Sequence, residues 1–166
     1  MSGGQINVPM VIRAPTGAGM QLGATHSQSF ETWLCEVPGL KVVAPSNPKD
    51  ALGLLRSSIK DLNPVIFAES AGLYGAKGEV PEEYFEIEIG KADIKQSGTD
   101  ITLVSYGHGM PLLQKVSEEL SNKNVSHVYQ EFSYLKGTSN ILTSSQMDNG
   151  TELYPVSHSY EGPGGL

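Results

Sequence analysis

The chain has 166 residues, a formal net charge of -7 at pH 7 and one cysteine. This length suits one ordinary domain, or one small domain and part of a second, and the acidic balance argues against nucleic acid and against an anionic membrane surface. No apolar run approaches the ~18 residues of a membrane span, and the N-terminus resembles neither a secretory signal nor a transit peptide, so we expect a soluble protein with a small-molecule or protein partner.

The first part of the chain predicts alternating strands and helices. Strands are expected at VPMVIR (8–13), KVVAP (41–45) and VIFA (65–68). Short, nearly continuous apolar runs are typical of strands that helices cover on both faces. The order strand, helix, strand, helix, strand therefore predicts an α/β fold with a parallel sheet.

The helix between the first two strands is expected to begin near His26. Thr25 and Gln28 have the spacing of a capping box, and Pro38 with Gly39 ends the helix. Its apolar positions follow at helical intervals and could serve the core or an interface: Phe30, Trp33, Leu34 and Val37.

The second helix has clearer boundaries. Asn47 is expected at the N-cap, Pro48 in the first turn, and Asp50 where its charge favours the helix dipole. Asn63 and Pro64 end the helix. The expected buried stripe is Ala51, Leu52, Leu55 and Ile59.

The later part of the chain is expected to form a connector and the start of a second domain. We predict a domain over 1–72, a connector over 73–96, the start of the second domain over 97–126, and a poorly ordered tail over 127–166. FEIEIG (85–90) predicts a half-exposed strand, ITLVSYG (101–107) a buried strand, and PLLQKVSEEL (111–120) a helix. After Val125 the pattern fades, and 137–166 are rich in Ser, Thr, Asn and Gly.

The glycine-rich loop gives only a weak sign of nucleotide binding. Gly17, Gly19 and Gly23 lie between a predicted strand and helix, but their spacing is G-x-G-x-x-x-G. No acidic residue ends the following strand and no Walker lysine follows, so a loop that needs small residues is the favoured interpretation.

Most polar candidates do not form a recognisable site. The histidines at 26, 108, 127 and 158 lack metal-ligand spacing, which makes a transition-metal site improbable. A Gly-x-Ser-x-Gly motif is absent, so a serine hydrolase has no support. The single cysteine, Cys35, excludes an internal disulfide and is expected to be a small buried hydrophobe.

His26 is the candidate for catalysis. At the start of a helix, the positive end of the dipole would favour neutral imidazole. A neutral ring can shuttle protons or donate a hydrogen bond to a developing oxyanion.

Several long blocks carry a resemblance to one family. They are MSGGQINVPMVIRAPTGAG, ATHSQSFETW, VPGLKVVAPSNPKDALGLL, SSIKDLNPVIFAES and LYGAKGEVPEEYFEIEIGKADI. Together they resemble the beta subunits of the thiamine-diphosphate-dependent 2-oxo acid dehydrogenases, above all those of pyruvate dehydrogenase, from Met1 to about Val125.

The resemblance implies a transketolase-like pyrimidine-binding domain followed by part of a transketolase C-terminal domain. The cofactor would be thiamine diphosphate, shared with an alpha subunit that holds its diphosphate through magnesium. The enzyme would decarboxylate pyruvate oxidatively and transfer the acetyl unit to lipoyl groups. Its partners would be the alpha subunit, a second beta subunit and the lipoyl acyltransferase core. Its location would be bacterial cytoplasm, mitochondrial matrix or plastid.

The resemblance also implies roles for particular residues. The family's active-site histidine falls on His26, whereas position 108 has no matching role. A monovalent cation such as potassium would be held by backbone carbonyls at five positions: Met10, Ser58, Ile59, Asp61 and Asn63.

The chain also departs from the family. Thr25 stands where the family usually has Gln or Glu, and the glutamate and aromatic residue that contact the pyrimidine would precede Met1. After Val125 the chain reads YQEFSYLKGTSN, which fits a truncated or frameshifted gene. A branched-chain 2-oxo acid or acetoin dehydrogenase beta subunit therefore stays open, as does a noncatalytic subunit, and we expect the isolated chain to be inactive.

Overall fold

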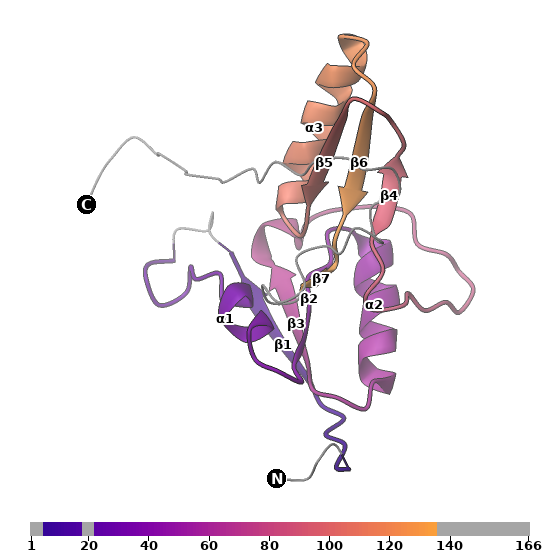
Figure 1. Ribbon diagram of the computed structural model, residues 1–166. Coiled ribbons are helices and arrows are strands. Elements are labelled where there is room, and N and C mark those ends of the chain that lie inside the picture. The colour runs from indigo at the N-terminus through magenta and orange to yellow at the C-terminus, as the bar shows by residue number, and fades with distance from the viewer. Residues whose placement is uncertain (1–4, 18–21, 136–166) are drawn as a thin grey trace.

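The computed structural model describes residues 5–17 and 22–135, which form two β-sheets with flanking helices (Figure 1). The first sheet has the strand order β1-β3-β2-β7, and the second has the order β4-β6-β5. Within the described residues, no helix is long and apolar enough to cross a membrane. The expected α/β fold is confirmed.

Three parallel strands make up most of the first sheet. They are β1 (Val11–Thr16), β2 (Lys41–Val43) and β3 (Val65–Ser70). β3 lies between the other two, with Val11 and Lys41 both opposite Val65. Because these strands run parallel, their carboxyl ends meet at one edge of the sheet, where open α/β sheets bind ligands.

β1 differs from the expected strand in both position and burial. It begins at Val11 rather than at residue 8, and it lies at an edge of the sheet. Ile12 is 45% exposed, since the described residues cover this strand only in part. The prediction that β1 is buried on both faces was therefore wrong.

The first helix is much shorter than expected. α1 spans Glu31–Cys35, with Phe30 at its N-cap and no side-chain capping hydrogen bond. The predicted start at His26 and the capping box are wrong, because Gln28 Nε2 donates to the carbonyl of Ala24 instead (2.9 Å). Trp33, at 71% exposed, lies outside the core.

The second helix confirms its predicted start. α2 spans Pro48–Lys60, and the side chain of Asn47 accepts a hydrogen bond from the backbone N–H of Asp50 (2.9 Å). Its buried stripe is rotated from the expected one, because Leu54 is buried while Ile59 is 65% exposed. The core consists of Val43, Leu54, Val65 and Phe67, against which Val11, Leu55, Ile87, Ile89 and Tyr134 pack.

The connector docks on α2 instead of forming a strand. After the short 3-10 helix η1 (Ala71–Leu73), the chain runs to residue 92 without forming a strand. The Ile87 N–H donates to the carbonyl of Gly53 (3.3 Å), and Ser57 Oγ donates to the carbonyl of Ile87 (2.5 Å). The alternation in 85–90 therefore marks one half-buried face that packs on a helix.

The second unit combines three strands and a helix. They are β4 (Asp93–Gln96), β5 (Ile101–Ser105), α3 (Gly109–Asn122) and β6 (His127–Glu131). β6 pairs antiparallel with β4 and parallel with β5. The helix expected at 111–120 is confirmed with shifted ends. The strand expected at 101–107 forms over 101–105, but the expectation that it is buried was wrong, since Ile101 is 40% exposed.

The segment after β6 returns to the first sheet. β7 (Tyr134–Leu135) pairs antiparallel with β2. The expected poor order over 127–166 was therefore wrong for 127–135. Residues 136–166 lie outside the described residues. The three expected domain boundaries stay predictions. The strand β6 was missed because its buried residues include His127 and Glu131, whose partners lie far away in sequence.

A partly buried ion cluster joins the two units. The ammonium of Lys95 in β4 lies 3.3 Å from Glu131 Oε2 in β6 and 3.8 Å from Asp50 Oδ2 in α2. It also pairs with Asp93 at 2.5 Å. Burial opposes the charged ammonium, but the carboxylates outweigh it and raise the pKa of Lys95. Burial raises the pKa of Glu131 as well, against the nearby Ser46 hydroxyl and Lys95.

The docking of the connector on α2 can be tested by adding one methyl group. In Gly53→Ala, the new Cβ would lie 2.7 Å from side-chain atoms of Ile87 and Phe85. We expect a net loss of about 1 to 2 kcal/mol in urea unfolding, because overpacking outweighs the better helix propensity of alanine. Gly72→Ala is the control, since no atom lies within 4 Å of its built Cβ. Equal stability of the two variants would contradict this packing.

Candidate functional site

A pocket that contains His26 opens at the carboxyl ends of β1 and β3. Its volume is about 240 Å³. The lining comes from the strand ends and from the loop that follows β1, and includes Thr16, Gly17, His26, Gln28, Phe30 and Ala71. The position agrees with the edge at which parallel α/β sheets bind ligands.

His26 reaches this pocket from a turn and not from a helix. Residues 24–26 form the turn, and the His26 N–H donates to the carbonyl of Gly23 (3.2 Å). The side chain is exposed, and α1 begins only at Glu31. The helix-dipole argument for a neutral ring therefore fails, and the catalytic role of His26 stays a prediction.

We name residues 17–30 the His26 loop. A backbone hydrogen bond joins its two ends. The Gly17 N–H donates to the carbonyl of Gln28 (3.1 Å), so the two ends of the loop meet beside β1. Gly17 has a φ of +92° and Gly23 a φ of +78°, conformations that favour glycine. These values support the interpretation of the glycine pattern as a structural loop, although Gly19 lies outside the described residues.

A buried carboxylate stands behind the pocket wall. Thr16 Oγ1 donates to Glu31 Oε1 (2.8 Å), and both residues are about 95% buried, with 4% and 5% exposed. The second oxygen, Glu31 Oε2, is buried and accepts no hydrogen bond. Sequence reasoning missed Glu31, because a glutamate beside an expected helix normally faces solvent.

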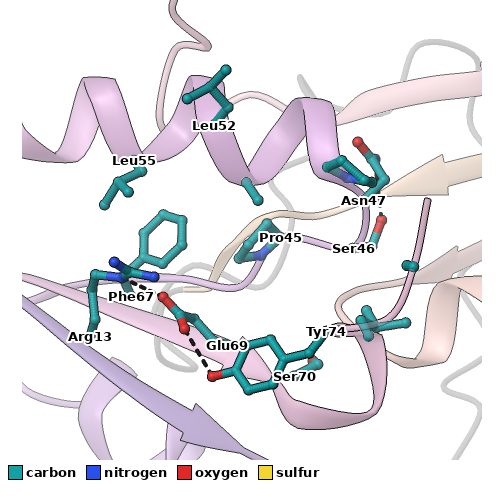
Figure 2. Close-up of a pocket in the computed structure, with 14 residues that line it drawn as sticks. Arg13, Pro45, Ser46, Asn47, Leu52, Leu55, Phe67, Glu69, Ser70 and Tyr74 are labelled. Carbon is teal, nitrogen blue, oxygen red and sulfur yellow. Dashed lines mark hydrogen bonds and ion pairs between the residues drawn. The ribbon is translucent and has the colours of Figure 1, made fainter. Parts of the chain in front are cut away.

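A larger pocket lies on the α2 side of the same sheet edge (Figure 2). Its volume is about 400 Å³, and its apolar lining includes Pro45, Leu52, Leu55 and Phe67. No sequence motif marked this pocket, since its lining comes from three separated segments.

The polar rim of the larger pocket is internally paired. Arg13 Nε donates to Glu69 Oε1 (2.5 Å), and Tyr74 OH donates to Glu69 Oε2 (2.9 Å). The hydrogen bond to Glu69 raises the pKa of Arg13, while burial and then Glu69 raise the pKa of Tyr74. Both shifts favour the usual charge states of Arg13 and Tyr74, so neither stands out as an acid or base.

The other histidines lie in different surroundings. His127 is fully buried, with Nδ1 3.0 Å from the carbonyl of Val125 and Nε2 2.6 Å from Ser117 Oγ. His108 lies beside Gly17, and His158 is outside the described residues. The described part of the chain holds no group of three or more metal-ligating side chains.

Cys35 is only half-buried. Its thiol lies 3.3 Å from the carbonyl of Thr32, and burial raises the pKa of this thiol. Within the part of the chain described here the cysteine is free, so a reactive thiolate is disfavoured.

The five residues expected to hold a monovalent cation gather at the opposite edge of the sheet. Ser58 and Ile59 lie in the last turn of α2, while the carbonyl of Met10 just before β1 accepts from the Val65 N–H (2.8 Å). The carbonyl of Ser58 accepts from the Asp61 N–H (3.3 Å). Two of the expected ligand carbonyls are thus already engaged, and the cation stays a prediction.

Asp61 organises the end of α2. Its Oδ1 accepts from the N–H and the Nδ2 of Asn63 (both 2.9 Å), and its Oδ2 pairs with Lys41. Burial alone would raise the pKa of this carboxyl, but the bonds from Lys41 and Asn63 outweigh burial and lower it.

Comparison with known proteins defines the class. Residues 1–77 match the family described as transketolase, pyrimidine binding domain. Among solved structures, the chain resembles a split gene transketolase described as an inactive beta4 tetramer. The TM-score is 0.62 at 18% identity, over 80% of this chain and 43% of that one. This likeness supports the fold alone, and the chain has a transketolase-like pyrimidine-binding domain.

Within that class, the chain is similar in sequence to pyruvate dehydrogenase E1 beta subunits. It is 48% identical over 126 residues to the pyruvate dehydrogenase E1 component subunit beta of Rhizobium meliloti (strain 1021), covering 75% of this chain and 27% of that protein. It is 45% identical over 125 residues to the acetoin:2,6-dichlorophenolindophenol oxidoreductase subunit beta of Bacillus subtilis (strain 168), covering 75% and 36%. The resemblance expected from the sequence is confirmed, and the chain spans about a third of these relatives.

The Thr16–Glu31 hydrogen bond can be tested by removing the hydroxyl. In Thr16→Val, both oxygens of the buried Glu31 would lack a hydrogen-bond donor, so we expect a loss of about 1 to 3 kcal/mol in urea unfolding. Thr25→Val is the control, because Thr25 is exposed in the same loop and should change stability by less than about 0.5 kcal/mol. Similar losses in the two variants would rule out this role for Thr16.

The Lys41–Asp61 pair should give a pH-dependent contribution to stability. Because the folded pKa of Asp61 is lowered, the contribution is present above the ordinary Asp pKa of about 3.9 and is lost as pH falls through the folded value. Lys41→Met should therefore cost about 0.5 to 1 kcal/mol near neutral pH and less as the pH approaches about 2. Lys91→Met, which removes an exposed pair with Glu88, should show no such trend in parallel urea titrations. A cost for Lys41→Met that grows on acidification would contradict the sign.

Proposed function

We propose that this chain contributes the pyrimidine-binding part of a beta subunit in a thiamine-diphosphate-dependent pyruvate dehydrogenase. The enzyme would decarboxylate pyruvate oxidatively and pass the acetyl unit to a lipoyl group. The observation that carries the proposal is the placement of His26 in a pocket at the carboxyl edge of the parallel sheet. The similarity to E1 beta subunits supports the same reaction class.

The residues of the His26 pocket fit part of the cofactor. Phe30 and Leu22 offer apolar surface, and the imidazole of His26 offers a hydrogen-bonding group. None of the described lining residues is a carboxylate, so the acid group expected to contact the aminopyrimidine is not among them. When bound, thiamine diphosphate supplies the carbon nucleophile that attacks the keto carbon of a 2-oxo acid and allows carbon dioxide to leave.

His26 would act on protons at the substrate and the lipoyl group. Its exposed ring can donate a hydrogen bond to the substrate oxygen and move a proton during acyl transfer. The pocket lies open in this chain, and water exclusion would require further protein surface.

The partners follow from the same proposal. An alpha subunit would hold magnesium and the diphosphate, a second beta subunit would complete the assembly, and a lipoyl acyltransferase core would accept the acetyl group. The exposed apolar side chains of Ile12, Trp33 and Val37 support association with other subunits. Potassium would bind near Met10 and Asp61, and the compartment would be bacterial cytoplasm, mitochondrial matrix or plastid.

The same experiments also test two alternative functions. The 45% identity to the acetoin oxidoreductase subunit favours acetoin as a second candidate substrate. A noncatalytic subunit is supported by the lack of a carboxylate in the described lining of the His26 pocket.

The activity test uses a chimera, since the chain spans 27% of the Rhizobium relative. Residues 1–125 replace the matching segment of that relative, and the chimera is assembled with its alpha subunit, thiamine diphosphate and magnesium. We expect lipoyl acetylation from pyruvate, and a loss of about 100-fold to 10,000-fold in His26→Ala.

Lys115→Ala in the same chimera is the control, because this exposed residue lies on α3 in the second unit. Acetoin and a branched-chain 2-oxo acid are assayed in parallel. Faster turnover of acetoin would favour the second candidate. A chimera that assembles but is indifferent to His26→Ala would overturn the catalytic assignment.

A further inference from the structure

The turn between β5 and α3 lies against the carboxyl edge of the first sheet. We name residues 106–109 the docking turn. A Cβ built on Gly107 would lie 2.9 Å from Ser70 Oγ, and Ser70 is the last residue of β3. A Cβ built on Gly17 would lie 3.8 Å from Nδ1 of His108. Two adjacent residues of the second unit thus border the ends of two strands of the first.

The residue before Gly107 is electrostatically linked to the same region. The pKa of Tyr106 is raised by burial and then by the negative charge of Glu31. Glu31 in turn holds Thr16 in the pocket wall. The geometric contacts of the docking turn with this part of the first unit are those of Gly107 and His108.

The backbone conformation explains why glycine stands at both contact points. Gly17 has a φ of +92° and Gly107 a φ of +51°, so an L side chain would be strained at either position. At Gly107 a side chain would also press on Ser70. At Gly107 the absence of a side chain thus leaves room for the Ser70 hydroxyl.

His108 is expected to contribute little to the stability of the fold. Its side chain is exposed and makes no capping hydrogen bond to α3. Truncating such a residue normally changes stability by less than about 0.5 kcal/mol. Any larger structural effect of replacing His108 would therefore be local. It would fall on Gly17 and on the His26 loop, which begins at Gly17.

We propose that Gly107 and His108 are positioning residues of the His26 site. Gly107 fixes the turn against the end of β3, and His108 confines Gly17, from which the His26 loop departs. The second unit thereby sets the geometry of a pocket whose lining comes from the first. This inference rests on the proposed function for its catalytic meaning, but its structural content can be tested separately.

The experiment uses NMR of the full 166-residue chain without cofactor or partner. In Gly107→Ala, the added methyl group pushes on Ser70, and we expect a shifted His26 ring resonance and about tenfold faster exchange of the Gly17 amide. Gly39→Ala is the matched control, because Gly39 also has a positive φ (+88°) but no atom lies within 4 Å of its built Cβ. Backbone strain alone should change the Gly17 and His26 signals equally in Gly107→Ala and Gly39→Ala.

His108→Ala provides a second, milder test. We expect it to change the Gly17 and His26 signals, and His108→Gln to restore them in part by refilling the space. If Gly107→Ala does not fold, His108→Ala decides alone. Wild-type signals at Gly17 and His26 in every folded variant of the docking turn would overturn the proposal.

The outcome is independent of the proposed enzyme activity. If Gly107→Ala moves His26 in the chain while His26→Ala leaves the chimera fully active, positioning stands and the catalytic proposal falls. If His26 is essential but insensitive to the docking turn, the positioning proposal falls and the enzyme proposal stands.

Discussion

The position of the second unit on the first depends on the ion cluster around Lys95. Its ammonium lies between Asp50 of α2 and Glu131 of β6, two carboxylates that are 5% and 0% exposed. A buried carboxylate that loses its cation typically costs about 3 to 5 kcal/mol. The units are therefore held in the arrangement that brings both acids to the same lysine.

Backbone hydrogen bonds continue this junction toward the candidate site. The Phe132 N–H donates to the carbonyl of Ser105 (2.9 Å), and the Ala44 N–H donates to the carbonyl of Ser133 (2.8 Å). The chain thus passes from β6 into β7, which extends the first sheet. With this path fixed, the turn after β5 meets the carboxyl ends of β1 and β3. The His26 pocket is lined by the first unit, and the docking turn of the second unit lies beside the strand ends that border it.

Sequence patterns predicted the elements whose signals are local. The cap at Asn47 and the buried run at 65–68 depend on neighbouring residues, and both are confirmed. His26 was selected through the family resemblance, and the structure places it in a pocket. The capping-box spacing of Thr25 and Gln28 was misleading, because Gln28 bonds to Ala24 and closes a turn.

The remaining features depend on partners that a local pattern does not contain. β6 reads as polar, yet His127 is buried because Ser117 and the Val125 carbonyl satisfy its ring. The stripe on α2 is rotated because the helix packs on the connector as well as on the sheet. His108 was expected to have no role, since its proximity to Gly17 arises from the junction at Lys95 and not from sequence spacing.

The most direct test of this account is a nuclear Overhauser contact between the ring of His108 and the α protons of Gly17 in the full chain. The account predicts that the contact is present in the wild type and weakens in Lys95→Met, because removal of the ammonium loosens the junction between the two units. Its absence in the folded wild-type chain, or its full strength in Lys95→Met, would contradict the claim that this junction positions the His26 site.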